Sequence, residues 1–325
     1  MTTLYELPTL RRLAGQIARV SAPDTASSEV LVPSAGASNA APVLLMPGAF
    51  NPPTIAHLAL AEESLRAVPG AQLYFSVGTT VINKERTERA TLPDRLLLLE
   101  QIARRLGSLG VVLTNRGLYL EQAAAARAAF PQAIALFFVV GYDKIEQIFD
   151  ARYYQERDKA LRQLLSLAGL LAAPRAGHEA DDVAALLNRP ENRPFQTAVR
   201  LISLPIDYRD IASSQIRAAL ETPSNHLTAS PLAHLLPPEA LAFCHETGCY
   251  SPPERLPSGE LIDRYGIRTA LIAHALALPE AVQVALDLLH LFQLATSDND
   301  VGRRLRRWLS KQWETISSLD LLAFQ

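Results

Sequence analysis

The chain has 325 residues, of which 49% are hydrophobic and 20% charged, and its formal net charge is −2. This composition is typical of a globular protein with two domains, or with one domain and an extension. Because no broad basic field is present, nucleic acid is not an expected partner.

The cysteine content and the hydropathy pattern define the expected cellular setting. Cys244 and Cys249 are the two cysteines of the sequence, too few for a metal framework or a disulfide-stapled secreted domain. The N-terminus lacks the apolar core of a signal peptide, and no stretch reaches the roughly 20 apolar residues that span a membrane. We therefore expect a cytoplasmic protein with reduced thiols, no membrane partner and no protein-bound metal centre.

The first 41 residues are expected to precede the main domain. Apolar residues at helical spacing predict a short amphipathic helix over residues 5–20. The segment 21–42 is rich in Ser, Ala and Pro, which is typical of a mobile linker. We place a compact domain at 42–222.

Within 42–222, short apolar runs alternate with helical patterns. Continuous apolar strands separated by helices predict an α/β fold with a doubly wound parallel sheet. The expected strands are 42–48, 71–78, 110–115, 133–141, 167–174 and 199–205. The expected helices are 54–68, 92–107, 120–130, 142–166 and 213–220.

The remaining residues, 223–325, have helical periodicity without attractive strand candidates. The segments 236–250 and 261–294 are apolar at helical spacing, and 301–316 is a basic amphipathic helix. We predict an all-helical C-terminal extension.

The turn after the first expected strand has the features of an anion site. Gly48 allows the backbone to approach a ligand closely, while Pro52 and Pro53 stiffen the loop. Thr54 is a suitable N-cap for the following helix, whose free N–H groups and dipole favour an anion. His57 falls in the first turn of that helix, so the sequence predicts phosphate binding here.

Two motifs give this turn a family context. Residues 48–57, GAFNPPTIAH, resemble the G-x-F-[DN]-P-x-[HT]-x-x-H signature of the nucleotidyltransferase superfamily. That superfamily includes the nicotinate and nicotinamide mononucleotide adenylyltransferases. Residues 211–217, IASSQIR, resemble its second signature, I-S-S-T-x-I-R. The resemblance extends over roughly residues 43–220 and implies a Rossmann-like nucleotidyltransferase fold.

The resemblance also implies site residues. Its signatures and intermediate segments imply ATP binding by Gly48, Ala49, Phe50, Thr54, His57, Gly141, Asp143, Ser213, Ser214 and Arg217. They imply acceptor binding by Asn51, Arg95, Tyr119 and Arg175. His57 and Arg217 are the expected catalytic residues, joined by Lys84 as a second phosphate cation.

Several of these assignments have alternatives. Lys84 is equally consistent with a solvated charge in a polar loop, and Asp94 and Arg95 with a helix-cap role. Thr54 stands where many members have a histidine, and Leu120 where they have a threonine. No aromatic residue is evident for stacking on a pyridine ring, although Tyr153 and Tyr154 are candidates.

The implied reaction joins ATP to nicotinate or nicotinamide mononucleotide and releases pyrophosphate, with Mg²⁺ bound to the triphosphate. A sister reaction with another phosphate acceptor is the first alternative. A non-catalytic nucleotide sensor is the second, because Thr54, Leu120 and the helical extension depart from the family pattern. The sequence leaves the oligomeric state open, a homo-oligomer included.

Overall fold

The computed structural model describes residues 3–34, 40–79, 89–175, 177–221 and 232–316, and for residues 3 and 313–316 it describes the backbone alone. The chain divides into two compact units. Unit 1 contains residues 1–18, 87–98 and 214–325, and unit 2 contains residues 19–86 and 99–213.

Unit 2 is built on a seven-stranded sheet with the order β1-β4-β3-β2-β5-β6-β7. From β4 to β7 all neighbouring strands are parallel, and β1 pairs with β4 in the antiparallel sense. Counted from β2, the parallel strands follow the order 3-2-1-4-5-6 of the Rossmann fold. The strands are Ser28–Val32 (β1), Val43–Pro47 (β2), Gln72–Gly78 (β3), Leu109–Thr114 (β4), Leu136–Gly141 (β5), Gly169–Ala173 (β6) and Val199–Leu201 (β7). The predicted α/β class and parallel sheet are confirmed.

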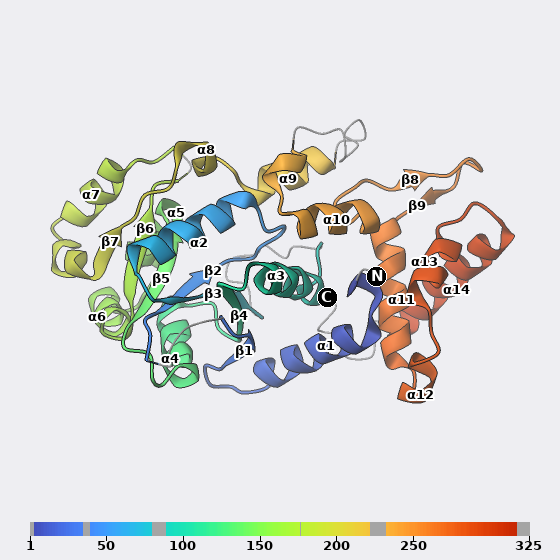
Figure 1. Ribbon diagram of the computed structural model, residues 1–325, viewed down its shortest axis with the longest axis horizontal. Coiled ribbons are helices and arrows are strands. Elements are labelled where there is room, and N and C mark those ends of the chain that lie inside the picture. The colour runs from blue at the N-terminus through green and yellow to red at the C-terminus, as the bar shows by residue number, and fades with distance from the viewer. Residues whose placement is uncertain (1–2, 35–39, 80–88, 176, 222–231, 317–325) are drawn as a thin grey trace. The chain divides into compact units, whose positions relative to one another are not determined.

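Helices cover both faces of this sheet, which explains its continuous apolar strands. In Figure 1, α2 and the pair α4 and α6 lie on opposite sides of the sheet. On the face of α4 and α6, alternate strand residues such as Leu45 and Phe138 form a buried core with α4 to α7. On the other face, Phe75 meets the turn that leads into α2. The helices of unit 2 are Ile55–Ala67 (α2), Tyr119–Ala129 (α4), Tyr142–Phe149 (α5), Arg157–Leu167 (α6), Ala180–Asn188 (α7) and Ile206–Arg209 (α8), with 3-10 turns Ala151–Tyr153 (η2) and Arg193–Ala198 (η3).

Two local predictions for unit 2 were wrong. Residues 28–32 were expected in a mobile linker, but they form β1, whose apolar residues extend the sheet along β4. The single helix expected over 142–166 is instead α5, η2 and α6. The break comes at Asp150, whose carboxylate accepts a hydrogen bond from the backbone N–H of Arg152 (2.9 Å) and caps the 3-10 turn.

Unit 1 is mainly helical, but the prediction of an all-helical C-terminal extension was wrong. Two-residue strands, Glu254–Arg255 (β8) and Leu261–Ile262 (β9), form a hairpin whose turn is closed by a hydrogen bond from the Leu256 N–H to the Glu260 carbonyl (2.8 Å). Its helices are Leu7–Ser21 (α1), Pro238–Thr247 (α10), Arg264–Ala277 (α11), Glu280–Gln283 (α12), Leu288–Ala295 (α13) and Asp300–Ile316 (α14), with 3-10 turns Thr3–Tyr5 (η1) and Ala233–Leu235 (η5). Helices Leu92–Leu106 (α3) and Ser213–Leu220 (α9) cross from one unit to the other. Among the described residues, none of the helices is both long and apolar enough to cross a membrane.

A buried ion pair anchors unit 1. Arg268 and Asp94 are 1% and 2% exposed and make two contacts, of 2.8 and 2.9 Å. The same carboxylate accepts hydrogen bonds from the hydroxyls of Tyr265 (2.6 Å) and Thr91 (2.9 Å). Asp94 therefore ties the first turn of α3 to α11, beyond the helix-cap role that its sequence position suggested.

Candidate nucleotide site

The candidate site lies at the carboxyl edge of the sheet in unit 2. Strand β2 has β3 on one side and β5 on the other, so the strand order reverses between β2 and β5. In doubly wound sheets, ligands bind outside the carboxyl ends of the strands at such a switch point. The residues that follow β2, β5 and β6 therefore lie at the edge where a ligand is expected.

The turn after β2 is held in one conformation by its own side chains. Phe50 has a positive φ of 48° and is 1% exposed, and its ring packs on Phe75 with centroids 4.9 Å apart. A Cβ atom on Gly48 would lie 3.0 Å from the Phe50 ring, so glycine allows this tight fold. The Gly48 N–H donates to the carbonyl of Ser76 (3.1 Å), while Ala49 is exposed on the turn. Asn51 is buried, at 1% exposed.

His57 is oriented by the N-terminal cap of α2. The backbone N–H of Thr54 donates to His57 Nδ1 (3.0 Å), and Thr54 Oγ1 lies 2.8 Å from the same nitrogen. Because Nδ1 accepts a hydrogen bond from the backbone, the proton of the neutral ring must be on Nε2. Burial of the ring and the positive charge of Arg175 lower the pKa of His57 to about 3. The ring is therefore a neutral hydrogen-bond donor at the N-terminus of a helix.

A second group of residues gathers at the ends of β5 and β6. A Cβ atom on Gly141 would lie 2.9 Å from Asp143 Oδ1 and 3.1 Å from Arg175 Cδ, so a glycine is needed for this close approach. Asp143 is exposed at the first turn of α5. Tyr119 begins α4, and burial together with the negative charge of Asp143 raises the pKa of its hydroxyl. An acid, a cation and a phenol thus stand together at this edge.

Hydrogen bonds join these two groups through the segment before α9. Arg175 Nη2 donates to the carbonyl of Ile211 (3.2 Å). Two residues later, Ser213 Oγ donates to the carbonyl of Pro52 (2.8 Å). The segment that carries the second motif is therefore bonded to the turn that carries the first.

The structure thus brings many of the predicted site residues together in unit 2. These are Gly48, Ala49, Phe50, Asn51, Thr54 and His57 after β2, Tyr119 after β4, Gly141 and Asp143 at the end of β5 and the start of α5, Arg175 after β6, and Ser213 at the start of α9. Thr54 is fully buried and contacts His57, so it acts through that histidine.

Four predicted residues are not in this group. Ser214 and Arg217 lie on the part of α9 that belongs to unit 1. Arg95 also belongs to unit 1, where it is 6% exposed and burial lowers its pKa. Lys84 lies outside the described residues.

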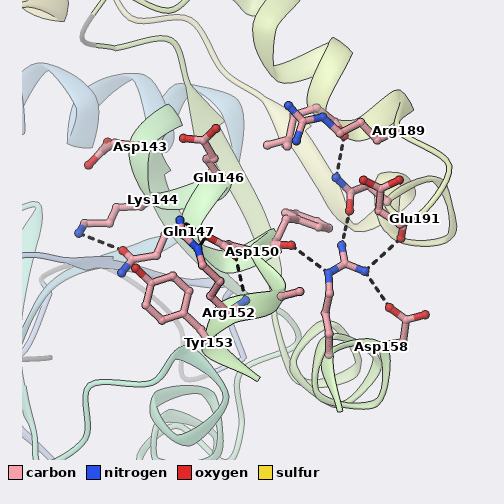
Figure 2. Close-up of a pocket in the computed structure, with 15 residues that line it drawn as sticks. Asp143, Lys144, Glu146, Gln147, Asp150, Arg152, Tyr153, Asp158, Arg189 and Glu191 are labelled. Carbon is pink, nitrogen blue, oxygen red and sulfur yellow. Dashed lines mark hydrogen bonds and ion pairs between the residues drawn. The ribbon is translucent and has the colours of Figure 1, made fainter. Parts of the chain in front are cut away.

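A pocket of about 960 Å³ has Asp143 among its lining residues (Figure 2). It is lined by α5, η2, the start of α6 and the end of α7, with acidic and basic side chains in similar number. Arg157 lines the pocket. Its Nε donates to the carbonyl of Phe149 (2.9 Å), and its Nη2 donates to the side-chain oxygen of the buried Asn192. Tyr153 lines this pocket. The other stacking candidate, Tyr154, donates its hydroxyl to the carbonyl of Ile148 (2.7 Å) and packs against the core.

Sequence reasoning missed one aromatic pair at this edge. The rings of Tyr142 and His178 are stacked, with centroids 3.9 Å apart and planes at 17°. Tyr142 follows Gly141 directly, and His178 lies three residues after Arg175. Nothing in the spacing of these two residues along the chain indicates that their rings meet.

Comparison with known proteins agrees with the motifs. A model of the cytidylyltransferase-like family matches residues 45–219, more than half of the chain. The chain belongs to the cytidylyltransferase-like family. The predicted nucleotidyltransferase resemblance is therefore confirmed, and the match covers every site element described above.

Individual relatives of this cytidylyltransferase-like protein are distant. A Halalkalibacterium halodurans protein named for nicotinate-nucleotide adenylyltransferase is 22% identical over 216 residues, which is 65% of this chain and 91% of that protein. A Schizosaccharomyces pombe protein named for nicotinamide mononucleotide adenylyltransferase is 26% identical over 156 residues, 46% of this chain and 60% of that protein.

The chain also resembles solved structures of adenylyltransferases at low identity. Plasmodium falciparum nicotinic acid mononucleotide adenylyltransferase was solved in complex with APC and with NaAD. The TM-scores are 0.47 and 0.49 at 15% and 16% identity, and each alignment covers 65% of this chain and 97% of that chain.

Proposed function

We propose that this protein transfers the adenylyl group of ATP to nicotinate or nicotinamide mononucleotide. The observation that carries the proposal is the state of His57, a neutral ring whose Nε2 proton is fixed at the N-terminus of α2, beside the switch point of the sheet. The names of the two distant relatives support a pyridine mononucleotide as the acceptor.

In the proposed reaction, a phosphate oxygen of the acceptor attacks the α-phosphorus of ATP in line. The bond from that phosphorus to the bridging oxygen breaks, and pyrophosphate leaves with the electron pair. Such transfers depend on positioning and charge stabilisation more than on covalent participation by the protein. His57 Nε2–H donates to a phosphate oxygen as charge develops, while the free N–H groups of α2 favour the same anion.

The cations and the remaining polar groups have separate proposed roles. Arg217, with Lys84, binds the β- and γ-phosphates, since guanidinium forks match phosphate oxygens. Ser214 adds a hydroxyl donor, while Ser213, whose hydroxyl donates to the Pro52 carbonyl, holds the two motifs together. Arg95 and Arg175 serve the acceptor. Mg²⁺ arrives with ATP as part of the substrate, held by phosphate oxygens and water.

The experiment is an acceptor panel with the purified full-length protein, Mg²⁺ and ATP. We expect pyrophosphate release and a dinucleotide product, identified by mass spectrometry, with one pyridine mononucleotide. Turnover with pantetheine phosphate or a flavin mononucleotide instead would identify a sister reaction. Nucleotide binding without turnover on any acceptor would identify a sensor.

The role of His57 is tested in the same assay. Loss of one donor to a developing oxyanion typically lowers kcat by about 100- to 1,000-fold, and this is the expectation for His57→Ala. His290→Ala is the matched control, because His290 is an exposed histidine on α13 in unit 1. An unchanged kcat in His57→Ala would remove the residue from the mechanism.

A further inference from the structure

The stacked pair of Tyr142 and His178 presents one open aromatic face beside the candidate site. Tyr142 is 6% exposed and belongs to the buried core of unit 2. Its ring covers one face of the His178 ring at 3.9 Å. The His178 side chain is nonetheless 45% exposed, so its uncovered face is directed to solvent. The pair is a flat platform with a rigid support underneath.

Contacts of the His178 backbone and ring add to the support from Tyr142. The His178 backbone N–H donates to the carbonyl of Arg175 (3.2 Å), which closes the turn after β6. His178 Nδ1 lies 3.7 Å from Asp182 Oδ2. That carboxylate oxygen also accepts a hydrogen bond from the backbone N–H of Glu179 (2.7 Å) at the cap of α7. A ring held in this way loses little conformational freedom when a second ring stacks on it.

The platform is directly connected to the groups that would hold a nucleotide. Tyr142 stands between Gly141 and Asp143 in the chain, and the turn that ends at His178 begins at Arg175. Arg175 lies close enough to His57 to lower the pKa of that ring. His57 (the proposed hydrogen-bond donor to phosphate), Asp143 and the aromatic platform therefore belong to one continuous edge of unit 2.

We infer that the open face of His178 is the subsite for the base of the donor nucleotide, and that it favours a purine over a pyrimidine by stacking. The inference rests on the proposed function and specifies its donor. A bicyclic purine overlaps an imidazole more fully than a single pyrimidine ring does, and stacking on an aromatic side chain contributes to binding without reading hydrogen-bonding edges.

The test measures equilibrium binding by calorimetry with ATP, CTP and inorganic tripolyphosphate, using full-length wild type, His178→Ala and His178→Phe. For His178→Ala we expect the Kd of ATP to rise about tenfold, that of CTP by less than about threefold, and that of tripolyphosphate to stay constant. His178→Phe keeps a ring and should bind ATP within about threefold of wild type. His290→Ala, measured in parallel, should match wild type for all three ligands.

Three results would overturn the subsite. These are an unchanged Kd of ATP in His178→Ala, an equal rise in the Kd of ATP and tripolyphosphate, and a Phe variant as weak as the Ala variant. The proposed function fails separately. If the variants show the expected binding pattern but the wild-type protein makes no dinucleotide, the base subsite is supported and the proposed reaction is refuted. If the wild-type protein makes dinucleotide but His178→Ala binds ATP as tightly as wild type, the reaction is supported and the base subsite is refuted.

Discussion

Replacing His57 with asparagine separates the titration of the ring from its place in the capping box. Asparagine Oδ1 occupies about the position of the histidine Nδ1, so it can still accept the hydrogen bond from the backbone N–H of Thr54. The variant therefore keeps the cap of α2 and removes a group whose pKa in the folded protein is lowered to about 3.

The magnitude follows from proton linkage. The unfolded chain binds a proton on His57 near the ordinary pKa of 6.5, whereas the folded protein resists protonation until about pH 3. Between these values the unfolded state binds more protons, so stability is fully present above pH 6.5 and is lost as the pH falls. The slope approaches about 1.4 kcal/mol per pH unit for one proton, which gives a loss of about 2 kcal/mol at pH 5 relative to pH 8.

The assay is urea unfolding followed by circular dichroism at pH 8, 7, 6 and 5. We expect the free energy of unfolding of wild type to fall by about 2 kcal/mol more than that of His57→Asn over this range. His290→Asn, at an exposed position, should keep the wild-type dependence. Parallel curves for wild type and His57→Asn would refute the neutral state on which the proposed mechanism depends.

Three further substitutions test other contacts. Ser213→Ala removes the hydrogen bond to the Pro52 carbonyl and should lower the free energy of unfolding by about 1 kcal/mol, with Ser213→Thr close to wild type in the same urea assay. Gly141→Ala inserts a methyl group 2.9 Å from a carboxylate oxygen, so ATP affinity measured by calorimetry should fall about tenfold or more while the melting temperature changes little. Arg268→Met leaves Asp94 buried without its cation and should cost about 3–5 kcal/mol by urea unfolding, and adding Asp94→Asn should recover part of that loss.

Periodicity and motif spacing were sufficient to predict the sheet and its edge. The apolar runs of β2 to β6 are each flanked by helical patterns, and only a parallel sheet covered on both faces explains them. Because carboxyl ends of parallel strands share an edge, the residues after β2, β5 and β6 could be assigned to one site from the sequence. His57 was predicted from its place in the turn after the first strand, whereas Asp143 and Arg175 were implied by the family resemblance.

The remaining features depend on contacts between distant residues. Strand β1 has an apolar core of three residues, and its pairing partner β4 lies about 80 residues away. The Asp94–Arg268 pair and the Tyr142–His178 stack also join residues with no local pattern in common. Each is defined by packing geometry, on which hydrophobic period and motif spacing carry no information.

The replacement of a histidine by Thr54 changes how the remaining histidine works. A buried Thr54 contributes no donor to a ligand, but its N–H and hydroxyl both face His57 Nδ1, and this leaves Nε2 as the donor. Raising the pKa of His57 from about 3 to 7 would need about 5 kcal/mol of charge stabilisation from a bound triphosphate. A hydrogen bond to a charged group contributes about 1.5–3 kcal/mol, which is less than this amount, so one hydrogen bond to phosphate does not protonate the ring. The proposed transfer then relies on a hydrogen bond from an uncharged imidazole, and the positive charge that balances the leaving pyrophosphate must come from arginine, lysine and Mg²⁺.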